Sequence, residues 1–479
     1  MAKKDYLEIM RSGGHLGTGQ QLMMTIQLSI PAILAQISSV IMEYIDASMV
    51  GQLGPDASAS IGLVSSSTWL GGGLIAAAST GFTVQVAHRI GAGDKKGARG
   101  IVKHGLLAVL VFSCIAAAAG ILISGSLPVW LGGGQAIRRD ASMYFLVFSF
   151  MAPAMAMRYT AGGMLQGSGN MKVPSTLNII CCFLDVLFNS FLIFPTRRVS
   201  VMGIGITIPG AGLRVTGAAL GTGCAEAVCA GCMLWFLLRR SEDLHLRRGE
   251  KHTFQRRELI TAAKISVPIA VENAISGTAY VAVTRIISPL GTVALAAHSF
   301  AITVEGLCYM PGYGISAAAT TMIGQSIGAG RKDLTRKLSW ISVVLGMLVM
   351  TGTGVLMYIF APQMIGILTP DPDIRALGAR VLRIEAFAEP MFAASIVASG
   401  VFRGAGDTLV PSIMNFVSMW LVRLTLASWL TPKMGLVGMW TAMCIELWFR
   451  GIIFLIRLYK KGRDGFRTIP GQAYRQRQK

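Results

Sequence analysis

Long stretches of apolar residues with almost no charge constrain this fold more than any other feature. Of the 479 residues, 53% are hydrophobic and 14% are charged, whereas about 25% of residues are charged in soluble domains. A run of about 20 apolar residues is long enough to cross a bilayer as a helix. Such stretches occur at residues 22–50, 59–83, 101–129, 142–167, 175–195, 216–238, 262–287, 294–322, 338–361, 382–402, 410–431 and 434–457. We therefore predict an all-α polytopic membrane protein with twelve transmembrane helices.

The second half of the chain repeats the first at an offset of 237 residues. Residues 164–175 read MLQGSGNMKVPS and residues 401–412 read VFRGAGDTLVPS. The same offset relates Pro31 to Pro268, far from this motif. So long a period indicates a duplicated domain rather than a solenoid repeat. Glycine and proline end helices and redirect the chain, so we predict conformational hinges at the repeated turn residues. These residues are Gly167, Gly169, Pro174, Gly404, Gly406 and Pro411.

Basic residues are distributed unevenly between the predicted loops. If the N-terminus is cytoplasmic, the inner loops and tails hold 27 Lys and Arg residues, the outer loops 8 and the spans 8 of the total of 43. This positive-inside bias predicts a multi-pass protein of the plasma (cell inner) membrane with both termini cytoplasmic. Despite the net charge of +20, the expected partner of the basic runs is anionic lipid of the bilayer, not nucleic acid.

The same bias fixes how the two halves are related. The loops at residues 89–103 and 328–337 are both basic and therefore both inner. Each half then holds an even number of spans, which predicts two parallel six-helix repeats related by a pseudo-twofold axis along the membrane normal. The predicted parts are a cytoplasmic N-terminal segment (1–20), an N-terminal lobe (21–238), a cytoplasmic basic linker (239–258), a C-terminal lobe (259–460) and a cytoplasmic basic tail (461–479).

Two other sequence features carry less weight. The first twenty residues are polar and lack the apolar core of a cleaved signal peptide. All eight cysteines fall within predicted spans. Cys229 and Cys232 are spaced as a CxxC motif, but in an apolar helix without a second pair this predicts packing rather than a structural metal or redox site.

Acidic residues inside the predicted spans mark a candidate site. Glu43 and Asp46 lie three residues apart, so both project from one helix face. A carboxylate at mid-bilayer costs about 2.5–3.5 kcal/mol on insertion scales, so such residues are functional candidates. The alternative is that both lie near the outer end of the span and are hydrated. Further polar candidates in spans 5, 6 and 7 are Asn178, Asp185, Thr222, Glu226 and Glu272.

The two halves differ in the chemistry of these positions. Asp46 is matched by Val283 in the second half, and Asp185 by Val422. Glu272 has no acidic counterpart in the first half, where the matching residue is alanine. We therefore expect the N-terminal lobe to carry the ion or substrate site, with a possible Na⁺ site at Asp46 and Asp185.

Several motifs together resemble the multidrug and toxic compound extrusion (MATE) transporters, in particular their prokaryotic branch, of the multidrug/oligosaccharidyl-lipid/polysaccharide flippase superfamily. The resemblance rests on Asp46-x(4)-Gly51-x-Leu53-Gly54, the paired G-x-G turns, Leu184-Asp185 and Gly217–Thr222. It implies two lobes around a central cavity that export amphipathic organic cations in antiport with H⁺ or Na⁺. It also implies that Asp46 and Asp185 match acidic positions of the N-terminal lobe, and Thr222 a polar position lining that pocket.

From these residues we expect a secondary transporter. Ionised Asp46 and Asp185, with Glu43 or Glu226, would hold a cationic drug until a proton or Na⁺ from the outer side displaces it. The chain has no G-x(4)-G-K-[ST] motif and no evident nucleophile–base pair, so we expect no ATP-driven pump, no enzyme and no cofactor, and a monomer.

Two alternatives stay open. A lipid-linked oligosaccharide flippase of the same superfamily would need a cationic cavity for a pyrophosphate, which Arg158, Arg285 and Arg423 can supply. A membrane receptor or scaffold would transport nothing, and the embedded acids argue against it.

Overall fold

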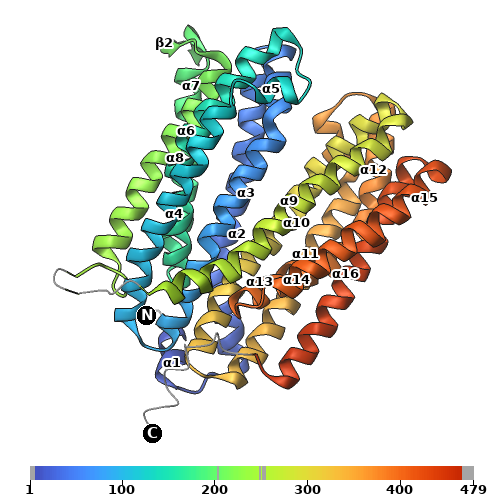
Figure 1. Cartoon of the computed structure of the whole chain (residues 1–479). Coiled ribbons are helices and arrows are strands. Elements are labelled where there is room, and N and C mark those ends of the chain that lie inside the picture. Colours follow the sequence, from blue (N-terminus) through green and yellow to red (C-terminus); the bar gives the residue numbers. More distant parts are fainter. Residues whose placement is uncertain (1–5, 202–203, 248–249, 251–254, 467–479) are drawn as a thin grey trace.

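The computed structural model describes all residues except 1–5, 202–203, 248–249, 251–254 and 467–479 (Figure 1). Its elements are α1 (Tyr6–Ser12), α2 (Thr18–Gly51), α3 (Pro55–Gly91), α4 (Lys95–Ile123), α5 (Leu127–Trp130), α6 (Gln135–Gly167), α7 (Lys172–Leu192), β1 (Pro195–Val201), β2 (Ile204–Ala211), α8 (Arg214–Trp235), η1 (Phe236–Arg240), α9 (Arg256–Ile287), η2 (Ser288–Leu290), α10 (Thr292–Gly328), α11 (Lys332–Leu368), α12 (Pro372–Glu385), α13 (Glu389–Gly404), α14 (Leu409–Val417), η3 (Ser418–Arg423), α15 (Leu424–Met434) and α16 (Leu436–Asp464).

The transmembrane helices agree with the sequence prediction except at one place. Among the described residues, 11 helices are long and apolar enough to cross a membrane. The predicted span at residues 382–402 is the exception, because it is divided into α12 and α13. Pro390 stands at the second position of α13, where its missing N–H is tolerated. The two pieces together take the place of the predicted helix, so the arrangement of six plus six is retained.

The helices form two lobes that are joined at one end of the molecule and diverge toward the other (Figure 1). Helices α2 to α8 make the N-terminal lobe, and α9 to α16 make the C-terminal lobe. The first helix of each lobe packs against the second helix of the other lobe, α2 against α10 and α9 against α3. This reciprocal packing follows from the sequence duplication, because α2 corresponds to α9 and α3 to α10.

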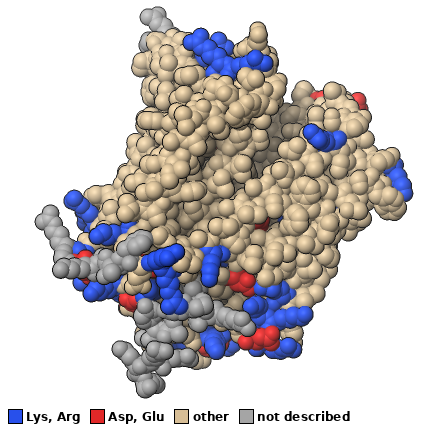
Figure 2. Space-filling view, viewed as in Figure 1, with Lys and Arg blue, Asp and Glu red and all other residues tan. Residues whose placement is uncertain are grey.

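The two ends of the molecule differ in charge. At one end lie α1, the linker between the lobes and the last turn of α16, and we call it the basic end (Figure 1). On the face that Figure 2 shows, Lys and Arg side chains gather at this end and at the far tip of the N-terminal lobe, while the surface between is largely uncharged, as expected for a membrane protein. At the opposite end the surface is hollowed between the two lobes (Figure 2). The molecule is therefore closed at the basic end and open at the other.

Glycine permits the close packing of the lobes at the basic end. A Cβ on Gly91 would lie 2.1 Å from the carbonyl oxygen of Gln325, and a Cβ on Gly328 would lie 2.1 Å from that of His88. These two glycines are related by the repeat, and both contacts cross between the lobes. Any larger residue would push α3 and α10 apart, so the closed basic end depends on both glycines.

Each lobe has its own apolar core, and a third core joins the lobes at the basic end. This third core contains Leu7 and Met10 of α1, Met24 of α2, and Ile315 and Phe454 of the C-terminal lobe. The sequence analysis treated residues 1–20 as a polar segment and did not predict α1. The apolar side chains Leu7 and Met10 of α1 are in fact buried against both lobes.

The first half also contains an insertion that the second half lacks. The insertion lies between α7 and α8, and it folds into the antiparallel hairpin β1–β2. The hairpin lies at the end of the N-terminal lobe away from the basic end (Figure 1). The offset of 237 residues therefore holds for the helices that precede the hairpin, and it is shorter for α8 and its counterpart α16.

Candidate ion and substrate site

Two of the predicted acids come together between α2 and α7. Asn189 Nδ2 donates to Asp46 Oδ1 at 2.9 Å and to Asp185 Oδ2 at 3.2 Å. Asp185 and Asn189 are four residues apart, so helical periodicity puts both on the face of α7 that meets α2. The structure thus joins Asp46 and Asp185 through a single amide, and Asn189 is a site residue that the sequence analysis did not select.

Close packing of α8 holds this amide in place. A Cβ on Gly221 would lie 2.0 Å from Asn189 Oδ1, so only glycine fits there. The adjacent residue Thr222 lies beside Asp185. The small residues of α8 therefore bring three helices to one point, which agrees with how membrane helices pack.

Two oxygens at this point lack partners. Asp185 is 1% exposed and Asn189 0% exposed, yet Asp185 Oδ1 and Asn189 Oδ1 have no hydrogen-bond partner among the described residues. Buried polar atoms are normally satisfied, so such oxygens call for a proton or a cation. Carboxylate and amide oxygens are hard ligands that suit H⁺ or a cation such as Na⁺. No group of three or more His, Cys, Asp or Glu residues arranged to hold a metal occurs in the described part of the chain.

Glu43 lies on the same face of α2 but outside this hydrogen-bonded group. Its side chain is exposed, whereas Asp46 is half-buried. The neighbouring Tyr44 hydroxyl donates to the carbonyl oxygen of Thr303 in α10 at 2.6 Å, which ties α2 to the other lobe. Asp46 and Glu43 therefore stand on a helix at the lobe interface.

Glu226 and Asn178 belong to a separate network around Arg158. The Arg158 guanidinium donates to Glu226 Oε2 and to Asn178 Oδ1 at 2.7 Å. Asn178 Nδ2 in turn donates to Ser39 Oγ at 2.9 Å. The charge of Glu226 is thus matched within the N-terminal lobe, and this network ties α2, α6, α7 and α8 together.

Glu272 lies in the C-terminal lobe, in contact with a different set of residues. It accepts hydrogen bonds of 2.6 Å from Ser412 Oγ and from Asn415 Nδ2. Asn415 corresponds to Asn178 in the repeat, and Asn178 contacts the carbonyl oxygen of Ala35, the residue that corresponds to Glu272. At equivalent positions, the asparagine therefore contacts a backbone carbonyl oxygen in the N-terminal lobe and a carboxylate in the C-terminal lobe. Glu272 is not hydrogen-bonded to Asp46 or Asp185.

The C-terminal lobe also buries a three-residue charge network. Glu446 is 0% exposed and accepts from Arg423 Nη2 at 2.6 Å and from Arg450 Nε at 2.7 Å. Ser418 donates to the same carboxylate. Arg423 is therefore neutralised inside the lobe.

A second group of buried acids lies in the same lobe. Glu385 and Glu389 are 0% exposed and flank the break between α12 and α13, and Glu305 of α10 is 6% exposed. The carboxylate oxygens of Glu385 and Glu389 have no hydrogen-bond partner among the described residues. The sequence analysis left these positions out of the site, although two acids four residues apart beside Pro390 were a signal for a broken helix with a buried acidic face.

The repeated G-x-G turns lie at the basic end. α6 ends at Gly167 and α13 at Gly404. Gly169 has φ +98° and Gly406 has φ +76°, a conformation that favours glycine and ends a helix. Pro174 and Pro411 fall in the first turns of α7 and α14. All six predicted hinge residues thus lie in, or at the helix ends that border, the two turns between helices.

Comparison with known proteins gives one consistent result. The MatE family model matches residues 31–191 and again 268–429, which together cover most of the chain and start 237 residues apart. The chain is 27% identical over 436 residues to "Probable multidrug resistance protein NorM" of Thermotoga maritima, covering 90% of both proteins. It is 24% identical to "Multidrug resistance protein MdtK" of Yersinia enterocolitica, covering 90% of this chain and 93% of that protein.

A solved structure supports the fold. "Outward-facing conformation of a multidrug resistance MATE family transporter of the MOP superfamily" superimposes with a TM-score of 0.86 at 18% identity. The match covers 97% of this chain and 99% of the other. The overall likeness extends to both lobes.

Proposed function

Because the chain belongs to the MatE family of multidrug-transporter-like membrane proteins, we propose that it exports amphipathic organic cations in antiport with H⁺ or Na⁺. The observation that carries this proposal is the pair of carboxylates, Asp46 and Asp185, held by the one amide of Asn189. Two carboxylates this close repel each other when both are ionised, and a proton or a cation relieves that repulsion.

The two charged ligands compete for the same oxygens. An organic cation bound near Asp46 stabilises the ionised carboxylates, and a proton or Na⁺ arriving at Asp185 neutralises them. The cation then loses its partner and leaves through the open end. Export follows if the basic end is cytoplasmic, and the excess of Lys and Arg there supports that orientation. The protein would then lie in the plasma membrane and act as a monomer.

The structure weakens the case for a lipid-linked oligosaccharide flippase. Such a protein would need free cationic side chains for a pyrophosphate. Arg158 is paired with Glu226, and Arg423 is paired with Glu446. Among the described residues, Arg285 is exposed and is the one of the three arginines without an acidic partner. The acidic pair and the neutralised arginines favour a cationic substrate.

A binding measurement tests the proposed substrate class. Tetraphenylphosphonium is used as the probe cation and an undecaprenyl pyrophosphate lipid as the rival ligand, with the purified protein and its Asp46→Asn variant. Loss of a partner for a buried charge costs about 2–5 kcal/mol, so the variant should bind the cation about 30-fold or more weakly. Tight binding of the lipid, unaffected by Asp46→Asn, would favour the flippase.

The buried acids Glu385 and Glu389 are the other place where a coupling ion can bind. Their unpartnered oxygens are the observation in favour of it. The Glu385→Gln and Glu389→Gln variants show which lobe binds the coupling ion. If the N-terminal site couples transport, both variants retain ion-dependent efflux; if they lose it while cation binding persists, the ion binds in the C-terminal lobe.

A further inference from the structure

The two G-x-G turns form reciprocal polar contacts between the lobes at the basic end. Gln325 Nε2 of the C-terminal lobe donates to the carbonyl oxygen of Gly167 at 2.8 Å. His88 Nε2 of the N-terminal lobe lies 2.8 Å from the carbonyl oxygen of Gly404. The offset of 237 relates His88 to Gln325 and Gly167 to Gly404. Each lobe thus closes on the turn of the other.

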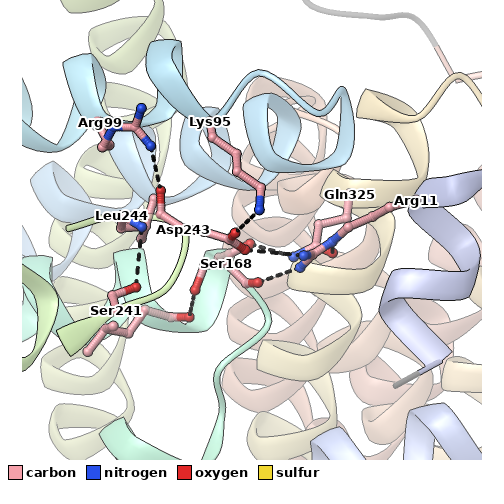
Figure 3. Close-up of polar contacts among 10 residues, drawn as sticks. Arg11, Lys95, Arg99, Ser168, Ser241, Asp243, Leu244 and Gln325 are labelled. Atoms are coloured by element: carbon pink, nitrogen blue, oxygen red, sulfur yellow. Dashed lines mark hydrogen bonds and ion pairs between the residues drawn. The ribbon is translucent and has the colours of Figure 1, made fainter. Parts of the chain in front are cut away.

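Arg11 of α1 adds a contact to one of these two turns. Its Nη2 donates to the carbonyl oxygen of Ser168 at 2.6 Å, and its Nε donates to Gln325 Oε1 at 3.1 Å. Its Nη1 lies 3.3 Å from Asp243 Oδ2 in the linker. Figure 3 shows Arg11 between Asp243, Ser168 and Gln325, and Lys95 reaching the same Asp243 carboxylate. One guanidinium therefore joins the N-terminal lobe, the linker and the C-terminal lobe.

Beside this contact, α1 covers the interface between the two lobes at the basic end, which we call the seam. Leu7 is 6% exposed and Met10 0% exposed, within the core that spans both lobes. The space beside Gly169 is filled by Leu7, whose Cδ1 would lie 2.5 Å from a Cβ on that glycine. The apolar face of α1 and the charge of Arg11 thus act on the same turn.

The second turn is held differently. Asp407, which follows Gly406, pairs with Arg457 and Lys461 of α16 at 2.5 and 3.6 Å. Both basic residues belong to the same lobe as Asp407. They can move with it, whereas the partners of Arg11 must separate when the lobes part. The arrangement is therefore asymmetric, although the turns themselves are repeated.

We propose that α1 and Arg11 form a latch that keeps the basic end closed while the opposite end is open. Because Ser168 and Gln325 lie on different lobes, access from the basic end requires Arg11 to release at least one of them. The latch rests on the alternating access expected of the proposed transporter, and it depends on neither the coupling ion nor the substrate. Releasing it would favour the conformation open at the basic end.

The test measures access to a residue inside the closed seam. Thr321 is 2% exposed and donates to the carbonyl oxygen of Gln166 across the seam at 3.1 Å. A Thr321→Cys chain in nanodiscs is treated with a membrane-impermeant thiol reagent, and modification of residue 321 is followed by peptide mass spectrometry. Arg11→Ala removes two charge-assisted hydrogen bonds that hold the seam closed, so adding it should speed modification about tenfold or more.

Matched variants separate a latch from general loosening. Arg463→Ala removes a basic residue from the same end, but that side chain is 71% exposed and pairs with its neighbour Asp464. It should leave the rate within about twofold, as expected for a surface ion pair. The native Cys181 and Cys229, which are buried inside the N-terminal lobe, should remain unreactive in every variant.

A second position guards against a Thr321→Cys chain that fails to fold. Thr25 of α2 is 0% exposed and contacts Met322 of the other lobe, so Thr25→Cys reports on the same seam. Equal modification rates in Arg11→Ala and Arg463→Ala at both positions would overturn the latch, as would parallel exposure of Cys181. Cation binding is measured separately. If the protein does not bind the organic cation but Arg11→Ala still speeds thiol modification, the proposed function is rejected and the latch is kept.

Discussion

Removal of Arg158 tests whether Glu226 stabilises the lobe or binds a substrate. Arg158 donates to Glu226 and to Asn178, and Glu226 is 6% exposed. In an Arg158→Met variant the buried carboxylate loses its counter-charge. Breaking a buried ion pair from one side costs about 3–5 kcal/mol, so we expect a clearly lower midpoint of thermal unfolding in detergent.

The double variant Arg158→Met/Glu226→Met gives the opposite expectation. Both charges are removed together, and an apolar pair of similar volume is often neutral or stabilising by about 1–4 kcal/mol. The double-mutant cycle should therefore give a coupling of about 2 kcal/mol or more. Arg285→Met, at an exposed arginine, is the control and should change the midpoint little.

Cation binding by the double variant decides the role of Glu226. If the ion pair is only structural, the double variant unfolds near the wild-type midpoint and binds tetraphenylphosphonium within about threefold of wild type, a difference below 1 kcal/mol. A stable double variant that no longer binds the cation would refute this reasoning and make Glu226 a substrate contact. An Arg158→Met variant as stable as wild type would refute the energetic argument itself.

Three further predictions concern the neighbouring acid, the seam and the orientation. Glu43→Asn removes a like charge one turn from Asp46, so the pH midpoint of cation binding should move to lower pH and fewer protons should be released per cation in a lightly buffered titration; an unchanged midpoint and proton count would leave Asp46 acting alone. Gly91→Ala should open the basic end and speed thiol modification there, because its Cβ would lie 2.1 Å from a backbone oxygen, whereas Gly19→Ala, with nothing within 4 Å, should not. A reporter enzyme fused after residue 479 should be active only in the cytoplasm, and activity outside the cell would reverse the orientation.

The number and the pairing of the helices could be predicted from the sequence, but the details of individual helices could not. The repeat register anticipated that the halves would be equivalent, and the structure extends this to reciprocal packing of α2 on α10 and α9 on α3. The division of the tenth span was missed because a window of apolar residues does not register a break of a few residues. Helix α1 was missed because seven residues with two buried apolar side chains give too short a pattern for periodicity.

The candidate site was predicted in part. Acidic residues inside apolar spans indicated Asp46 and Asp185, and the structure brings them together through Asn189, which helical spacing from Asp185 could have indicated. The pairing of Arg158 with Glu226 joins residues 68 positions apart on different helices. No local pattern encodes such a contact, since it depends on how α6 and α8 pack. For the same reason the sequence could not separate Glu272 from the acids of the other lobe.

Efflux of an organic cation from proteoliposomes, driven separately by a proton gradient and by a sodium gradient, tests the central proposal most directly. Wild-type protein should export tetraphenylphosphonium when one of these gradients is imposed. The Asp46→Asn and Asp185→Asn variants should insert and fold normally but lose the ion-driven part of efflux, while Glu272→Gln retains it. Ion-driven efflux that persists in both Asp variants and disappears in Glu272→Gln would contradict the account and place the ion site in the C-terminal lobe.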